Sequence, residues 1–131
     1  MKQMLPFFMF QEGVAEEAMN HYVSVFEDAK IQAIERYGPD GPGEEGTVLR
    51  ARFMVKDQEF MCIDSHIQHD FTFTPSISMY ITCENEEEID HLYTELKEGG
   101  NELMPIGDYG FSQKFAWVND RFGVSWQLNL E

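Results

Sequence analysis

The sequence predicts an α+β fold built from two βαβββ modules that follow one another along the chain. The 131 residues are enough for one domain of this kind. Two stretches, Val14 to Phe26 and Glu86 to Glu98, show the apolar periodicity of amphipathic helices. Short segments with strand character surround each helix, one before it and three after it, so the element order repeats. We expect one domain over residues 1–131, with modules at 1–64 and 76–131.

The first module begins with Met4 to Phe10, which is apolar and aromatic-rich, as in a buried strand. Glu16 and Glu17 lie in the first turn of the helix, where the helix dipole favours negative charge. Gly and Pro crowd the segment Gly38 to Gly46, which therefore forms either a flexible flap or a long hairpin tip. The strands after the helix are expected at Lys30 to Tyr37, Thr47 to Val55 and Glu59 to Asp64.

The second module follows a polar and aromatic connector, Ser65 to Pro75. Gly99 and Gly100 end its helix, because glycine readily adopts the left-handed conformation found after helices. A turn at Asn119 to Gly123 joins the last two strands. The four strands are expected at Ser76 to Cys83, Glu102 to Ile106, Lys114 to Val118 and Val124 to Leu130.

The charge of the chain limits its partners. Lys and Arg number 9 against 24 Asp and Glu, which gives a net charge of −15. Such a chain repels phosphate backbones and anionic lipid heads, so we expect no nucleic-acid partner and no membrane partner. There is no apolar run of about 18 residues, and the amino end reads as a strand and not as a signal peptide. Two isolated cysteines, Cys62 and Cys83, indicate buried thiols and a cytoplasmic location.

Segments spread over essentially the whole chain carry a family resemblance. They are Glu16 to Tyr22, Phe60 to Asp64, Phe71 to Pro75, Ser78, Glu86 to Asp90 with Gly99-Gly100, and the most specific one, Trp117 to Gln127. In these segments the chain resembles the vicinal oxygen chelate superfamily, which includes glyoxalase I, bleomycin-resistance proteins and extradiol dioxygenases. Within it, the chain is most similar to the PhnB-like group. The resemblance implies a glyoxalase/bleomycin-resistance-like fold, with curved mixed sheets around a cleft, and a homodimer.

The resemblance also implies where a divalent metal would bind. Metal-dependent members place His or Glu on the first and last strand of each module, and the metal acts as a Lewis acid. The four positions fall near Leu5 to Phe7, near Asp64, near Ser78 and at Gln127. Hydroxyl and amide groups are weak, uncharged ligands, so we expect no metal. If a metal does bind, the expected ligands are Asp64, His66 and Gln127.

Members of this group have often carried a label as demethylubiquinone methyltransferase-like. The chain has no glycine-rich strand–loop–helix segment of the kind that would hold S-adenosylmethionine. Its one Gly-rich loop runs into Glu44 and Glu45, which would repel a phosphate. We therefore do not expect methyl transfer, and we assign no catalytic residue.

Polar side chains alternate along two strands of the second module. Residues two apart on a strand share a face. Ser125, Gln127 and Asn129 therefore point one way, and Ser78 shares a face with Tyr80 and Thr82. Such a surface can recognise a small polar or aromatic molecule. Alternatively, Ser78 and Gln127 bond to each other or to water and only hold the modules together. The expected ligand-binding residues are Ser78, Tyr80, Trp117, Ser125, Gln127, Phe8 and Phe10.

Three functional hypotheses follow. The favoured one is a metal-free cleft protein that binds an unknown small molecule. The alternative is a metal-dependent lyase, isomerase or dioxygenase of the same superfamily, with ligands from Asp64 and His66, in the histidine-bearing segment Asp64 to Asp70. Against this alternative, we expect that segment to be a solvated connector between the modules. The third hypothesis is an interaction module without any ligand.

Overall fold

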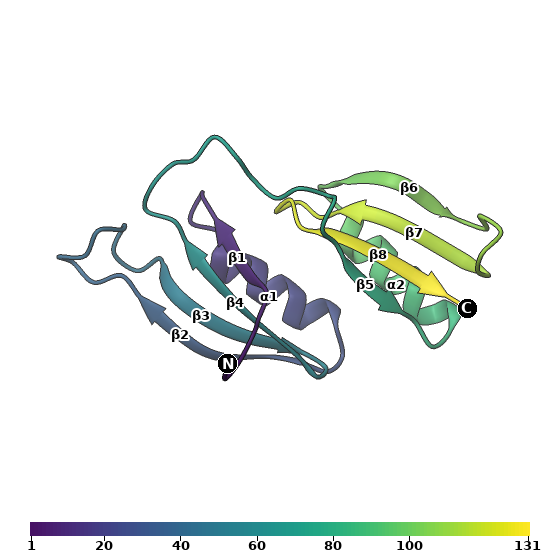
Figure 1. The fold of residues 1–131 in the computed structure, drawn as a ribbon, viewed down its shortest axis with the longest axis horizontal. Helices are drawn as coiled ribbons and strands as arrows, with labels where there is room; N and C mark the ends of the chain where they lie inside the picture. The colour runs from purple at the N-terminus through teal and green to yellow at the C-terminus, as the bar shows by residue number, and fades with distance from the viewer. The chain divides into compact units, whose positions relative to one another are not determined.

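The computed structural model describes residues 1–131, and the chain divides into two units, Met1–Asp70 and Phe71–Glu131. Each unit contains one helix and one four-stranded sheet (Figure 1), which confirms the prediction of two βαβββ modules. The elements of the first unit are β1 (Phe7–Phe10), α1 (Ala15–Val25), β2 (Ala29–Arg36), β3 (Val48–Val55) and β4 (Gln58–Asp64). Those of the second are β5 (Met79–Thr82), α2 (Glu86–Lys97), β6 (Asn101–Gly107), β7 (Lys114–Asn119) and β8 (Ser125–Leu130).

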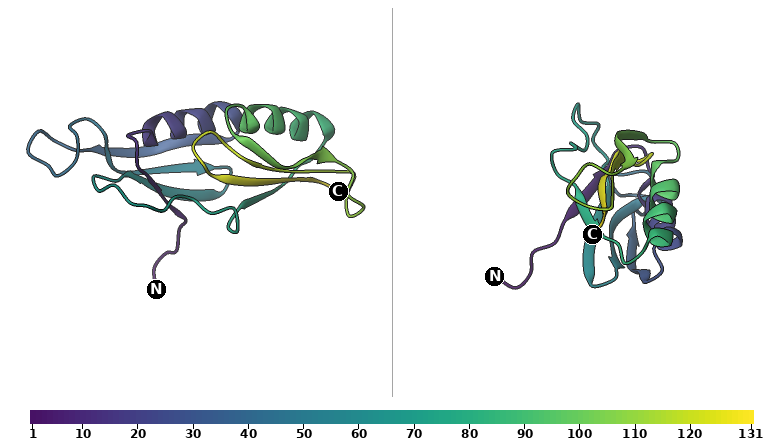
Figure 2. Two further views of the ribbon diagram at one scale, coloured as in Figure 1. Left: turned by 90° about the horizontal axis from the view of Figure 1, so that it is seen from above. Right: turned by 90° about the vertical axis from the view of Figure 1, so that its right-hand side faces the viewer.

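In the first unit the strand order is β1-β4-β3-β2, and only the β1–β4 pair is parallel. The helix α1 lies along one face of this sheet (Figure 2). Its Tyr22 ring stacks on Phe53 of β3, with ring centroids 5.9 Å apart. Phe53 in turn stacks on Phe60 of β4 at 5.0 Å, and Phe8 of β1 lies 5.4 Å from Phe60. Aromatic rings therefore form the core between α1 and its sheet.

The second unit repeats this topology with the order β5-β8-β7-β6, in which β5 and β8 are parallel. Its helix α2 begins after Asn85, whose side chain accepts a hydrogen bond from the Glu88 N–H at 2.9 Å. This is a local cap of the kind that stabilises helix starts. The apolar side of α2 buries Ile89, Leu92 and Leu96. Neither α1 nor α2 has the length and apolar character needed to cross a membrane.

Both leading strands start later than the sequence predicts. β1 starts at Phe7 because Pro6 has no N–H to give to the ladder, although its carbonyl still accepts from Met61 N at 3.0 Å. β5 starts at Met79 because the residues before it form a turn, in which Ile77 N donates to the Thr74 carbonyl at 3.2 Å. Proline is favoured at the second position of such a turn, and Pro75 occupies this position.

The loop Gly38 to Gly46 extends beyond the ends of β2 and β3 (Figure 1) and is anchored at its base. Tyr37, at its start, is buried, and its hydroxyl donates to the Asp64 carbonyl at 2.9 Å. Gly43 lies against this ring so closely that a Cβ atom there would come within 2.6 Å of ring carbons. Only glycine permits this approach, so the loop contacts the Tyr37 ring at Gly43, while its other residues are exposed.

Candidate functional site

One ion pair shows which face of the second sheet its helix covers. Lys114 of β7 places its Nζ 3.0 Å from Asp90 of α2, so Lys114 points toward the helix. Trp126 and Leu128 of β8 lie on the same side, because strand residues alternate and Leu130, two residues on, pairs with Lys114. The opposite surface, which we call the helix-free face, carries Trp117, Ser125, Gln127 and Asn129.

Three of the predicted binding residues form one row across the helix-free face. Tyr80 of β5 pairs with Gln127 of β8, and Gln127 pairs with Trp117 of β7. Adjacent strands lie about 4.8 Å apart, so the row is about 10 Å long, the size of a two-ring molecule. We call Tyr80, Gln127 and Trp117 the aromatic–amide row. Tyr80 is 57% exposed, and the other two side chains are half-buried.

Two hydrogen bonds orient this row and leave other polar atoms open. Gln127 Nε2 donates to Ser78 Oγ at 2.9 Å, and Trp117 Nε1 donates to Ser125 Oγ at 2.8 Å. The alternative to ligand binding predicted from the sequence is a Ser78–Gln127 bond that holds the modules together. The bond is present, but both of its residues belong to the second unit. It uses only the amide nitrogen. The carbonyl oxygen Oε1 of Gln127 and the hydroxyl of Tyr80 keep their hydrogen-bonding capacity.

An aromatic cluster beside the row was missed by the sequence reasoning. Phe115 is two residues before Trp117 on β7 and shares its face. The β6–β7 loop brings two more rings onto it: Phe111 lies 4.9 Å away and Tyr109 lies 6.1 Å away, centroid to centroid. The signal in the sequence was three aromatic residues within seven positions next to a strand, Tyr109 to Phe115.

The structure places Phe8 and Phe10 in the core of the first unit. They are 6% and 2% exposed, and Phe8 contacts Phe53 and Phe60 under α1. Neither ring is available on the surface that α1 leaves open. Successive residues of a strand point to opposite faces of the sheet. Phe7, and not Phe8 or Phe10, therefore lies on the surface that α1 leaves open.

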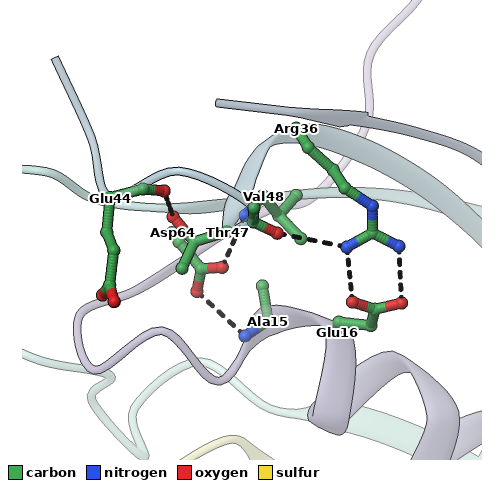
Figure 3. Close-up of polar contacts among 8 residues, drawn as sticks. Ala15, Glu16, Arg36, Glu44, Thr47, Val48 and Asp64 are labelled. Carbon is green, nitrogen blue, oxygen red and sulfur yellow. Dashed lines mark hydrogen bonds and ion pairs between the residues drawn. The ribbon is translucent and has the colours of Figure 1, made fainter. Parts of the chain in front are cut away.

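Asp64 is buried, and its carboxylate is held by two backbone N–H groups (Figure 3). Oδ1 accepts from Ala15, the first residue of α1, at 2.9 Å, and Oδ2 accepts from Val48 of β3 at 2.8 Å. Val14, at the cap position of α1, offers no side-chain bond, so Asp64 caps the helix in its place. A metal ion at Asp64 would have to displace these N–H groups.

The other proposed metal ligands do not complete a site. His66 is exposed, and its ring contacts Tyr37 with centroids 6.2 Å apart. No group of three or more His, Cys, Asp or Glu side chains is arranged so that it could hold a metal ion. The amide of Gln127 can offer only its uncharged oxygen, because its nitrogen donates to Ser78. The residues implied by the superfamily's metal positions therefore do not fit a resident metal ion.

The cysteines are not suited to nucleophilic chemistry. Cys62 and Cys83 are free and buried, and burial raises the pKa of each thiol to about 12. The reactive form of cysteine is the thiolate, which is negligible at neutral pH with such a pKa. Glu16, close to Asp64, is different: a hydrogen bond from Arg36 at 2.5 Å lowers its carboxyl pKa. This pair lies on the surface between α1 and β2 (Figure 3).

A family model and a solved structure point to the same family for this chain. Residues 2–129 match the family model described as 3-demethylubiquinone-9 3-methyltransferase. The PhnB protein from Bacillus cereus is 55% identical, with a TM-score of 0.95, over 99% of this chain and 100% of that chain. A protein from Pseudomonas aeruginosa is 27% identical, with a TM-score of 0.84, over 100% of this chain and 98% of that one. No match was found among curated proteins.

A more distant structure shows the fold alone. It is a glyoxylase/bleomycin resistance protein/dioxygenase domain from Frankia, 12% identical, with a TM-score of 0.67, over 99% of this chain and 97% of that one. Together with the sheet order in each unit, this confirms the predicted glyoxalase/bleomycin-resistance-like fold.

The methyltransferase description implies S-adenosylmethionine, and the described residues can be tested for it. Nucleotide-type cofactors are commonly held where a glycine-rich turn exposes a helix N-terminus. The N-terminus of α1 is occupied by the Asp64 carboxylate, and that of α2 by the Asn85 side chain. Three glutamates also crowd the first turn of α2. Neither helix start fits this cofactor.

Proposed function

The chain belongs to the PhnB-like family of the glyoxalase/bleomycin-resistance superfamily, and from this premise we propose that it binds a small molecule on the helix-free face without a metal ion. The observation that carries the proposal is the aromatic–amide row. A half-buried indole and an exposed phenol flank an amide whose oxygen makes no hydrogen bond. Flat apolar surface with a few oriented polar groups is typical of ligand sites.

The chemistry of the row selects the ligand class. The Tyr80 hydroxyl can donate a hydrogen bond, and Gln127 Oε1 can accept one. A carboxamide group offers the matching acceptor and donor, and an aromatic ring attached to it can lie on the indole of Trp117. The net charge of −15 disfavours anions. The proposed ligand is therefore a neutral or cationic aromatic compound with amide-like polarity.

Benzamide is a probe for this proposal, and the two tryptophans of the chain provide the readout. Trp117 belongs to the row, whereas Trp126 is buried and donates its Nε1–H to Asp120 at 2.9 Å. Titration of 15N-labelled protein should shift the indole N–H signal of Trp117 and leave that of Trp126 in place. Benzoate, which has the same ring and a negative charge, should bind more weakly.

A pair of variants makes this experiment specific. Tyr80→Phe removes only a hydroxyl from the row and should weaken benzamide binding by about fivefold to tenfold, the cost of one hydrogen bond. Tyr93→Phe removes the same group from α2, where the ring packs under Lys97, and should change nothing. If benzamide leaves the Trp117 signal unmoved, or if both variants behave alike, the proposal is wrong.

The metal-dependent alternative is checked by thermal unfolding with Zn, Ni, Co, Mn, Fe and Mg. A metal present at 100 times its dissociation constant would stabilise the fold by about 2.7 kcal/mol, or several degrees in melting temperature. We expect a change of no more than about one degree, since the carboxylate of Asp64 is already held by two N–H groups.

The proposal includes a cytoplasmic homodimer. The free cysteines support a reducing compartment, because Cys62 and Cys83 are buried without a disulfide. Exposed apolar side chains support self-association, among them Phe71 at 58% and Ile77 at 69% exposure. Light scattering coupled to size-exclusion chromatography should give about twice the chain mass of 15.3 kDa. A monomer at micromolar concentration would contradict this part of the proposal.

A further inference from the structure

A second row lies next to the aromatic–amide row on the helix-free face. Asn129 of β8 pairs with Thr82 of β5 on one side and with Phe115 of β7 on the other. Asn129 is two residues beyond Gln127, which places it on the same face about 7 Å farther along the strand. The two rows therefore form one continuous surface of the second unit.

The side chain of Asn129 is buried without a hydrogen-bonding partner. The residue is only 6% exposed, and its Oδ1 atom is buried and makes no hydrogen bond. Its backbone is satisfied, since the Asn129 carbonyl accepts from Cys83 N at 2.7 Å. A buried polar atom with no partner is costly, and nearly all such atoms in proteins have one.

Local packing gives no reason for an amide at this position. On its own face Asn129 lies between Thr82 and Phe115, its Oδ1 accepts no hydrogen bond from either, and a leucine at 129 would leave no orphan atom. By contrast, the neighbouring Ser125 has a clear structural use, because it holds the indole of Trp117. The unused acceptor of Asn129 therefore points to a partner from outside the chain.

The surroundings of Asn129 indicate what that partner is. Phe115 lies beside it, and the aromatic cluster of Tyr109, Phe111 and Phe115 continues from there. Tyr109 and Phe111 are 42% and 62% exposed, so their rings are open to contact on one side. An acceptor next to a wall of rings suits a flat molecule that carries a donor on its edge.

We infer that Asn129 and the aromatic cluster form a subsite for an aromatic ring or heterocycle bearing an N–H donor, which bonds to Oδ1. This inference rests on the proposed function and extends its site by one row. The ligand is then a compound whose one end carries an amide-like group for Gln127 and whose other end carries a ring N–H for Asn129.

The covered position of Oδ1 requires a side chain to move when the ligand enters. Phe111 is the most exposed ring of the cluster, and it belongs to a loop and not to a strand. Tyr109 is fixed more firmly, because its hydroxyl donates to the Pro105 carbonyl at 2.5 Å. Binding should therefore rotate the ring of Phe111, which then lies against the bound ligand, and leave Tyr109 in place.

Indole and 1-methylindole are a matched pair of probes, since they differ only in the N–H group. In NMR titrations of the 15N-labelled full chain, indole should shift the side-chain amide signal of Asn129. It should also bind about tenfold more tightly than 1-methylindole, the effect of one hydrogen bond to a buried acceptor. Equal binding of the two probes, or no binding of indole, would overturn the inference.

Variants test whether Asn129 is the source of this discrimination. Asn129→Leu should lower the affinity for indole to that for 1-methylindole, and the melting temperature of this variant shows that it folds. Asn119→Leu is the control: its Oδ1 is also buried and unpartnered, but it lies on the Ser125 row, away from the cluster. Discrimination that survives in Asn129→Leu, or disappears in Asn119→Leu, contradicts the inference.

A third variant and a third probe complete the test. Phe111→Ala changes an exposed side chain, so it should fold normally and weaken both probes while keeping their ratio. Benzofuran, which carries an acceptor in place of the N–H, should bind no better than 1-methylindole; a preference for it would overturn the inference. If benzamide still shifts Trp117 while indole and 1-methylindole bind equally, the subsite fails and the proposed function stands.

Discussion

In each unit, three paired residues form a row across the sheet. They lie on the first strand of the unit, on its last strand and on the strand before the last. In the second unit this is the aromatic–amide row. In the first unit it consists of Phe7, Met61 and Arg52, which pair across β1, β4 and β3. Both rows lie on the face that the helix does not cover, but their polar groups are used differently.

In the first unit, the polar side chains on this face bond to one another. Arg52 Nη1 lies 2.7 Å from Glu59 Oε1, and the other oxygen of Glu59 accepts from Gln3 at 3.1 Å. Arg50, two residues before Arg52, is paired with Glu35 at 3.1 Å. In the second unit, by contrast, the open atoms of the row have no partner. The same topology therefore gives one internally paired face and one with unused hydrogen-bonding capacity, and our proposal of ligand binding concerns the latter.

The two helices differ in a similar way. The N-terminus of α2 is capped locally by Asn85, three residues before its bonding partner Glu88. The N-terminus of α1 is capped by Asp64, which is 49 residues from Ala15. The first unit thus relies on a long-range contact where the second uses a neighbouring residue.

The largest expected effect tests this difference in capping. Asp64→Ala removes two charge-assisted hydrogen bonds from buried N–H groups and should lower the free energy of unfolding by about 3 kcal/mol. Asn85→Ala removes one exposed cap bond and should cost about 1 kcal/mol. Urea unfolding of both variants measures the difference. If Asp64→Ala costs no more than Asn85→Ala, the long-range cap has no special weight.

The next effect exchanges the central residues of the two rows. Gln127→Met gives the second unit the residue found in the first and should weaken benzamide binding about tenfold, through the loss of one or two hydrogen bonds. The reverse change, Met61→Gln, should create no binding, because its neighbours are Phe7 and a paired arginine. Isothermal calorimetry or NMR titration checks both variants. If Met61→Gln gained benzamide binding, the aromatic and unpaired neighbours of Gln127 would not be needed for binding.

A smaller effect is expected when the ion pair of the first row is removed. Arg52 and Glu59 are 39% and 22% exposed at their side chains, so Arg52→Met should lower the free energy of unfolding by at most about 1 kcal/mol. Benzamide binding should stay as in the unchanged protein. Urea unfolding at low and high salt separates the ionic contribution, which should shrink at high salt. A loss of binding would link the two faces functionally.

The smallest effect concerns Glu16 and Arg36. The hydrogen bond from Arg36 lowers the carboxyl pKa of Glu16, so this pair stabilises the fold above the ordinary glutamate pKa. That contribution disappears as the pH falls through the lowered value, when the carboxylate becomes protonated. The melting temperature of Glu16→Gln should lie about one or two degrees below that of the unchanged protein at pH 7, since the pair is exposed. The two should converge once the pH lies below the lowered pKa of Glu16; a constant difference would rule out an ionic origin.

Alternation along the chain was sufficient to predict which residues of β8 share a face, but not that the helix leaves this face uncovered. Ser125, Gln127 and Asn129 share a face, as expected, because β8 is polar on one side and apolar on the other. The same rule could not orient β1, in which every residue is apolar, so Phe8 and Phe10 gave no sign that they belong to the core.

Long-range contacts account for the rest. The sequence shows a carboxylate at the end of β4, but whether Asp64 binds a metal or caps a helix depends on what lies near it in space. Val14, which has no capping side chain, was the available sign that α1 needs a cap from elsewhere. The aromatic cluster was not predicted, because Tyr109 and Phe111 lie in a loop, where hydrophobic periodicity gives no information about side-chain direction.

The long-range cap also has a consequence for synthesis on the ribosome. Asn85 and Glu88 are made within three residues of each other, so the start of α2 can be completed almost as soon as it is translated. The start of α1 must wait for residue 64, because its cap comes from the last strand of its unit. Until then the first helix lacks its stabilising partner, and the whole first unit should fold as a single late cooperative step.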